Sequence, residues 1–245
     1  STFGNCSALT NLNALADWNT EKVTGTPWIF SNCSSLTDIS ALSKWDVGNI
    51  KNMRYIFHGC SSLTDLSALA GWQTGSVTDM SGIFYGCSSL TGLGALAGWQ
   101  TGSVTDMNAM FYGCSSLTDL GALAGWQTGS VRNMAKMFQD CYALTDLNAL
   151  KDWQTGNVTK MSGMFYRCSL LMDLDALAGW QTGSVTDMYG MFSDCLKLQN
   201  ASAINDWNIA NVSNFSRMFY HCPVHPEFTK CSGTWDSEGT FYPYT

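Results

Sequence analysis

A fixed period of 27 residues runs through most of this 245-residue chain. The segment 71–97, GWQTGSVTDMSGIFYGCSSLTGLGALA, is followed at once by a nearly identical copy. An uninterrupted period of this length is the signature of stacked repeats, in which each repeat buries its apolar face only against its neighbours. The sequence therefore predicts one continuous solenoid. The period is plainest in one tryptophan column: Trp18, Trp45, Trp72, Trp99, Trp126, Trp153, Trp180 and Trp207.

Each repeat contains two short β-prone stretches and two short turns. In the repeat that begins at Trp72, residues 77–79 favour a strand, and the apolar residues of 80–87 have helical spacing after the N-cap candidate Asp79. Residues 88–93 favour a second strand, and a second helical turn is expected at Gly94. The predicted fold is a β-rich, right-handed, leucine-rich-repeat-like solenoid of about eight 27-residue coils, with short parallel strands and short helical or 3-10 turns.

The two ends of the chain depart from the repeat. Residues 1–222 form the predicted solenoid, with a partial first coil and an atypical last one, and residues 223–245 form a tail without repeat character. Because the first residues match the middle of a repeat, we expect either that a leader was removed or that the chain is a piece of a longer one. The aromatic-rich tail suits a C-terminal cap, which solenoids need to cover their exposed core.

Nine of the ten cysteines also form one column with the 27-residue period. Stacked in register, their Cβ atoms run parallel, about 4.8 Å or more apart, which is unsuited to disulfides. We interpret the column as buried thiols that pack as small hydrophobes. Only Cys231 lies outside it, which makes a Cys222–Cys231 disulfide the main candidate bond. A weaker alternative is a zinc site formed by His221, Cys222, His225 and Cys231.

The composition excludes several classes of function. A net charge of −7 and a pI near 4.7 argue against nucleic-acid binding and against docking on anionic lipid. The sequence has no run of about 18 apolar residues, so it predicts no membrane span. With three histidines and none of the common catalytic motifs, the chain is not expected to be an enzyme or to hold a cofactor.

The sequence pattern of the repeat resembles that of a known family. Trp99-Gln100-Thr101-Gly102-Ser103-Val104-Thr105-Asp106-Met107, with Met110-Phe111, Cys114 and Leu117-Thr118-Asp119-Leu120, closely resembles the BspA-like leucine-rich-repeat surface proteins. The resemblance covers about residues 3–222, with one residue more per coil than the usual 26 of that family. It implies a non-enzymatic, extracellular or cell-surface protein, often an adhesin for host or matrix proteins.

The outward columns are the candidates for a binding face, because the inward ones are occupied by packing. Stacked threonines could also form the flat, weakly charged plane of an ice-binding protein, the weakest of three functional alternatives. The tryptophans could stack on sugars, although an internal ladder is the expected role, and an aspartate column from Asp38 to Asp173 is expected to cap turns or face solvent. The binding-face candidates are Thr64, Thr91, Thr118, Thr145, Thr78, Thr105, Thr159, Thr186, Tyr85, Tyr112 and Tyr166.

Two further expectations concern partners. The face would bind a protein or a glycan through many weak polar contacts, or, alternatively, an open N-terminal coil would stack on another copy and build a filament or coat. In a eukaryotic secretory route, six sequons could carry glycans. These are Asn5, Asn32, Asn157, Asn200, Asn211 and Asn214.

Overall fold

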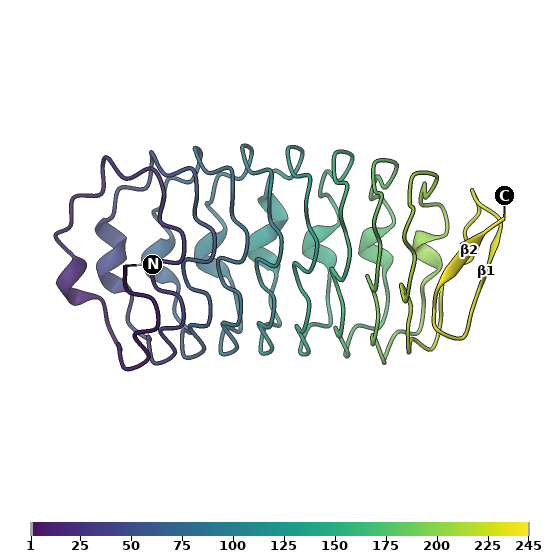
Figure 1. Cartoon of the computed structure of the whole chain (residues 1–245), viewed down its shortest axis with the longest axis horizontal. Coiled ribbons are helices and arrows are strands. Elements are labelled where there is room, and N and C mark those ends of the chain that lie inside the picture. Colours follow the sequence, from purple (N-terminus) through teal and green to yellow (C-terminus); the bar gives the residue numbers. More distant parts are fainter. Residues whose placement is uncertain (1, 245) are drawn as a thin grey trace.

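The computed structural model describes residues 2–244, which form a row of similar coils followed by a small hairpin at the C-terminal end (Figure 1). One 3-10 turn per coil lines one side of the row. The 3-10 turns are η1 (Asn13–Leu15), η2 (Ser40–Lys44), η3 (Ser67–Leu69), η4 (Gly94–Leu96), η5 (Gly121–Gly125), η6 (Asn148–Leu150), η7 (Asp175–Leu177) and η8 (Ser202–Ile204). The predicted repeat solenoid is thus the observed architecture.

Parallel pairing between coils is reduced to single residues. Asp79 pairs with Asn52 on one side and with Asp106 on the other, and this column of bridges continues from Gly25 to Asn214. The expected short parallel strands are therefore only isolated bridges. The two strands among the described residues are β1 (Gly233–Trp235) and β2 (Phe241–Pro243), which pair antiparallel within the tail.

The helical turn expected over 80–87 is not formed. Gly82 and Gly86 adopt left-handed backbone conformations, with φ of 58° and 72°. The N–H groups of Met80 and Gly82 donate to Asp106 O and Asn108 O of the next coil, at 2.9 and 2.8 Å. A helix would use these donors within its own turn, whereas the stack uses them to join neighbouring coils. With left-handed residues in this segment, the N–H groups of residues 80, 82, 84 and 86 all point toward the next coil on the C-terminal side.

The second turn is helical as expected, but its cap lies two residues earlier than predicted. Ser67 is the first helical residue of η3, and Leu66 before it makes no side-chain cap bond. Instead the Ser67 N–H donates to Asp65 Oδ1 at 2.8 Å. The capping role considered for the aspartate column is thereby confirmed, since Asp38, Asp119, Asp146 and Asp173 make the same bond in their coils.

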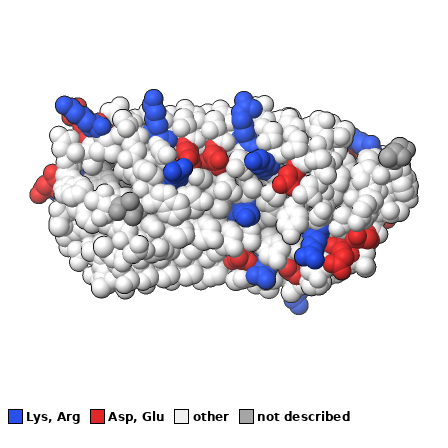
Figure 2. All heavy atoms as spheres, viewed as in Figure 1, with Lys and Arg blue, Asp and Glu red and all other residues white. Residues whose placement is uncertain are grey.

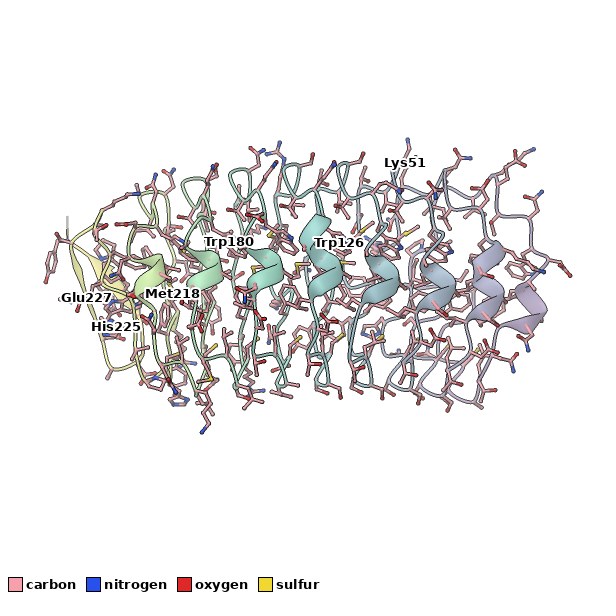
Figure 3. The ribbon with its side chains drawn as sticks, turned by 180° about the vertical axis from the view of Figure 1, so that it is seen from behind. Lys51, Trp126, Trp180, Met218, His225 and Glu227 are labelled. Atoms are coloured by element: carbon pink, nitrogen blue, oxygen red, sulfur yellow. The ribbon has the colours of Figure 1, made fainter. Side chains whose placement is uncertain are left out.

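The core is built from the invariant columns. Phe84 and Cys87 are fully buried, and Phe84 stacks on Phe57 and Phe111 with ring centroids 5.8 Å apart on each side. Full burial of an apolar side chain of this kind contributes about 1.5–3 kcal/mol relative to exposure. The tryptophans from Trp45 to Trp207 form the expected internal ladder beside the 3-10 turns, where Figure 3 shows Trp126 and Trp180, whereas Trp18 in the first coil is exposed. Trp126 Nε1 donates to Leu96 O, 30 residues earlier, at 3.1 Å.

The tail covers the C-terminal coil. The last coil has N–H groups that point away from the stack, and Phe219 donates one to Gly239 O at 3.0 Å while Arg217 donates another to Thr240 Oγ1 at 2.9 Å. Phe241, the first residue of β2, is buried and packs edge-on against Phe215. The tail therefore replaces the carbonyls that a further coil would supply, as a cap must.

No helix within residues 2–244 has the length and apolar character needed to cross a membrane.

Candidate binding surface

Three outward columns lie on the turns that carry the left-handed residues, and together they form what we term the turn face. Unlike the core columns, they differ from coil to coil. None of the side chains below is fully buried. The turn face consists of Trp28, Tyr55, Lys136 and Arg217, of His58, Tyr85, Tyr112, Gln139, Tyr166 and Tyr220, and of Asp140, Arg167, Asp194 and His221.

The N-terminal half of the turn face is aromatic. Trp28 stacks on Tyr55 with centroids 4.0 Å apart and planes 6° from parallel, and Tyr85 stacks on Tyr112 at 4.3 Å and 3°. His58 bridges the two pairs, at 5.3 Å from Trp28 and 4.8 Å from Tyr85. Partial burial lowers the pKa of His58 below its ordinary value, which favours the neutral ring. This half therefore offers flat, uncharged ring surface.

The C-terminal half is charged, and the charges occupy strained positions. The slot that holds a glycine at Gly59, Gly86 and Gly113 holds Asp140 and Arg167 in later coils, with φ of 60° and 57°. Left-handed conformations cost an ordinary L-residue roughly 1–2 kcal/mol. Glycine occupies the same slot in three other coils without this strain. Strain that is retained in this way is typical of functional surfaces.

The charged side chains form a chain of contacts across three coils. Arg167 lies 3.7 Å from Asp140 Oδ1 and 4.0 Å from Asp194 Oδ2, with its guanidinium 5.2 Å from the Tyr166 ring centroid. Asp194 Oδ1 is also 2.8 Å from His221 Nδ1. Figure 2 shows that charged side chains are sparse on the face it draws and that positive and negative groups lie close to one another there. The turn face thus carries paired charges in place of a patch of one sign.

A cavity of about 450 Å³ opens where the two halves meet. Its walls include Tyr112, Tyr166 and Tyr189, with Lys136 and Asp140 between them. Gly163 also lines it and contributes no side chain at a position where other coils carry Tyr55 or Lys136. This volume lies within the range of small-molecule and sugar-sized pockets. The missing side chain is the physical reason for the hollow.

The Asp140 carboxylate brings a largely buried negative charge to the cavity wall. Its Oδ1 is shielded from solvent and makes no hydrogen bond, with Arg167 Nη1 3.7 Å away, and the side chain as a whole is 14% exposed. The pKa of the nearby Tyr112 hydroxyl is raised, first by desolvation and then by the charge of Asp140. A carboxylate can only accept hydrogen bonds. This side chain therefore marks the cavity as the best candidate for a specific contact.

A second cavity, of about 500 Å³, lies in the tail. It is lined by residues that hold the cap together, among them Phe228, Trp235 and Phe241. The one indole donor there, Trp235 Nε1, already donates to Pro226 O at 3.0 Å. Figure 3 labels His225 and Glu227 in this region, at the end of the row. Because its walls are the aromatic residues that pack the cap together, we attribute this cavity to cap packing.

The threonine candidates do not reach the turn-face cavity. Thr78 and Thr105 are exposed, and their hydroxyls donate to Lys51 O and Thr78 O of the preceding coils, both at 3.2 Å. Thr159 and Thr186 donate in the same way. Lys51 interrupts the column and projects from the molecule (Figure 3). The hydroxyl hydrogens are thus committed to the backbone, which disfavours the ice-binding alternative. Thr64, Thr91, Thr118 and Thr145 are exposed on the column before the 3-10 turns.

The candidate zinc ligands are not brought together. His221 pairs with Asp194, and His225 stacks on Trp235 with centroids 5.0 Å apart. Within residues 2–244, no group of three or more His, Cys, Asp or Glu side chains is arranged to hold a metal ion. Cys222 and Cys231 are free thiols, so the expected disulfide is not formed in the structure. Cys222 Sγ instead donates to Phe192 O at 2.9 Å, as the other column thiols do to their phenylalanines.

The sequon asparagines are exposed except for Asn214, which is half-buried. Asn157 and Asn211 use their side-chain amides to donate to Gly129 O and Gly183 O of the preceding coils, at 2.8 and 2.6 Å. Asn32 donates its amide to Asn5 Oδ1 at 2.9 Å. Glycosylation stays a prediction, and at Asn32, Asn157 and Asn211 a glycan would be attached to the nitrogen that donates this hydrogen bond between coils.

The repeats match a family model of known proteins. Residues 1–93, 91–176 and 145–240 each match the family model described as "Mycoplasma protein of unknown function, DUF285". The chain belongs to this family. The match confirms the BspA-like tandem-repeat assignment drawn from the repeat wording. No curated protein matches the chain.

Among solved structures, the chain is similar to a leucine-rich cell surface protein from Faecalibacterium prausnitzii A2-165. The identity is 16%, the TM-score is 0.35, and the match covers 78% of this chain and 70% of that one.

Sequence reasoning found part of the turn face. Tyr85, Tyr112 and Tyr166 were expected to point outward and do so, but Asp140, Arg167 and Tyr189 were not among the candidates. The signal was present, because these residues replace glycine or small residues of other coils. Only the left-handed φ at that slot shows why the replacement is costly.

Proposed function

We propose that this family member is a non-catalytic, extracellular or cell-surface repeat protein that binds a macromolecular partner through its turn face. The contrast between invariant core columns and variable turn-face columns carries the proposal. A scaffold under selection for stacking alone has no reason to place Arg167 and Asp140 where glycine is less strained. The surface location rests on the BspA-like wording of the repeats, whose resemblance implies it.

The self-assembling alternative has less support. Head-to-tail stacking needs both end coils to be bare, because each new coil supplies carbonyls to the N–H groups of the one before it. The tail already supplies them, through Gly239 O and Thr240 Oγ1. A filament would first have to displace the cap. Binding to a different partner requires no such rearrangement.

The test is a binding screen on the folded chain. Immobilised protein is probed with a panel of purified extracellular-matrix proteins and with a printed panel of glycans, and hits are compared with a Tyr112→Ala/Tyr166→Ala variant. We expect at least one hit, weakened about tenfold or more in the variant, because aromatic anchors dominate interfaces. A matched Thr78→Ala/Thr105→Ala variant alters the threonine column and should bind as the parent does.

Two results would count against the proposal. A screen without any hit in either panel removes its basis. A hit that is lost equally in the tyrosine and threonine variants would move the binding site away from the turn face.

A further inference from the structure

The turn-face cavity has a lining that selects for one kind of chemistry. Its charged groups are two cations, Lys136 and Arg167, and two anions, Asp140 and Asp187. Their formal charges cancel, so the cavity has no net preference for an anionic or a cationic ligand. A phosphate, a sulfate or an amine would meet as many repelling groups as attracting ones.

The polar groups of the wall require a ligand that both donates and accepts hydrogen bonds. The Asp140 carboxylate can only accept hydrogen bonds, whereas the Lys136 ammonium and the half-exposed Arg167 guanidinium can only donate. Hydroxyl groups do both, since each has one donor and two acceptor positions. Several hydroxyls on one small frame would match this wall without adding charge.

The aromatic walls require a ligand with an apolar side as well. Tyr112 stacks on Tyr85 and Tyr166 lies against the Arg167 guanidinium, so both rings are held in place by neighbours. A sugar ring has a C–H face that packs on an aromatic ring and an equatorial edge of hydroxyls. The rings of Trp28, Tyr55 and Tyr85, of which the first two are stacked and the third is tilted by 46° from Tyr55, extend this aromatic surface away from the cavity, along the axis of the solenoid.

From these observations we infer that the cavity between Tyr112 and Tyr166 binds a neutral sugar residue of a glycan, with Asp140 accepting a hydrogen bond from one of its hydroxyls. The inference rests on the proposed function and deepens it by naming the class of partner. It also relocates the sugar-stacking role considered for the tryptophan column, which is buried from Trp45 to Trp207.

The experiment uses the whole chain and a printed array of neutral and sialylated oligosaccharides, followed by titration of the best neutral oligosaccharide in solution with ligand-observed NMR. We expect neutral glycans to bind and sialylated ones to give no stronger signal. Tyr166→Ala should weaken binding about tenfold or more, because stacked aromatic contacts are worth of the order of one factor of ten. Asp140→Asn should also weaken it, because the amide can present a donor where the ligand needs an acceptor.

A second variant blocks the cavity without removing any wall. Ser162 lines it, and the equivalent position one coil later is Tyr189, so Ser162→Tyr places a ring at a position that this fold already accommodates. It should abolish glycan binding while thermal unfolding stays within a few degrees of the parent. Tyr242→Ala, which removes a tyrosine that is 54% exposed in the tail, is the matched control and should bind normally.

The outcomes separate the two levels of the proposal. If matrix proteins bind and lose affinity in Tyr166→Ala while no glycan binds, the sugar inference is wrong and the proposed function stands. If sialylated glycans bind more strongly than neutral ones, the inference of a neutral ligand is overturned. Glycan binding that survives in the blocked variant Ser162→Tyr would place the sugar elsewhere.

Discussion

The hydroxyl of Thr101 joins two coils through both backbone groups of Gln127. Thr101 Oγ1 donates to Gln127 O at 3.0 Å and accepts from Gln127 N at 2.8 Å, and Thr101 itself is 1% exposed. The same pair of hydrogen bonds recurs with Thr74, Thr128 and Thr155. This column of threonines is therefore part of the structure of the stack and is not available to a ligand.

Replacing Thr101 by valine should destabilise the chain. Thr101→Val keeps the shape and leaves both backbone groups of Gln127 without this partner, which costs about 2 kcal/mol. Thr105→Val is the matched control, because Thr105 is exposed and its hydroxyl makes one bond at the surface, and it should change stability by less than about 0.5 kcal/mol. Urea denaturation followed by circular dichroism measures both. Equal effects of the two substitutions would contradict the stabilising role of this pair of hydrogen bonds.

The thiol column should make the fold sensitive to alkaline pH. Desolvation by burial raises the pKa of Cys60 to about 12 from its ordinary value of 9.0. The folded core accepts the neutral thiol, so its stabilising effect is complete below pH 9 and is lost as the pH rises from 9 toward 12. At pH 11 this thiol alone should have cost roughly 2–3 kcal/mol of stability.

Cys60→Ala isolates this effect. The variant starts from a lower stability at pH 8 but should lose roughly 2–3 kcal/mol less than the parent between pH 8 and pH 11. The exposed Cys6 supplies the control, since Cys6→Ala should leave the alkaline loss unchanged. Chemical denaturation at both pH values gives the comparison. A parent whose stability is constant over this range would show that the thiols are not desolvated.

Alkylation should distinguish the cysteines by position. Burial raises the pKa of Cys87 and its neighbours in the column well above the ordinary value, and each of these thiols donates to a backbone carbonyl. Because the thiolate is the reactive form, iodoacetamide at pH 8 should modify the exposed Cys6 quickly and leave the buried thiols from Cys33 to Cys195 unmodified until the chain is unfolded. Peptide mass spectrometry reads the sites. Rapid modification of Cys87 in the folded chain would contradict the packing described.

The cap should depend on one glycine. Gly239 has φ of 66°, and a Cβ there would overlap the backbone of Phe219 and Tyr220. Gly239→Ala should lift the hairpin from the last coil, lower stability by at least about 2 kcal/mol and leave the N–H of Phe219 unpaired. Gly125→Ala is the control, because a Cβ there meets nothing within 4 Å. Thermal unfolding reports stability.

Light scattering then tests the role of the cap in association. An uncovered last coil exposes Phe215 and Phe219, so Gly239→Ala should associate as concentration rises, while Gly125→Ala behaves as the parent. A stable, monomeric Gly239→Ala variant would show that the tail does not act as the cap. Association of the parent chain itself would revive the filament alternative.

The sequence by itself determined the repeat and its core. A column that holds Phe, Cys or Trp in nearly every copy can only face inward, because a solenoid has no other place to bury so many apolar groups. The capping aspartates were also within reach, since Asp at a turn start has a local mechanism. These features depend on residue type and spacing alone, and both are read directly from the chain.

The tertiary structure decided which outward residues meet. Residues 80–86 have a helical spacing, yet the stack recruits their N–H groups for bonds between coils, so the chain there alternates left-handed residues and the turn face projects from it. Tyr112, Asp140 and Tyr166 come from three different coils, and the hollow between them exists because Gly163 carries no side chain. Contacts of this kind depend on the register between coils and on backbone conformation, which residue spacing alone does not specify.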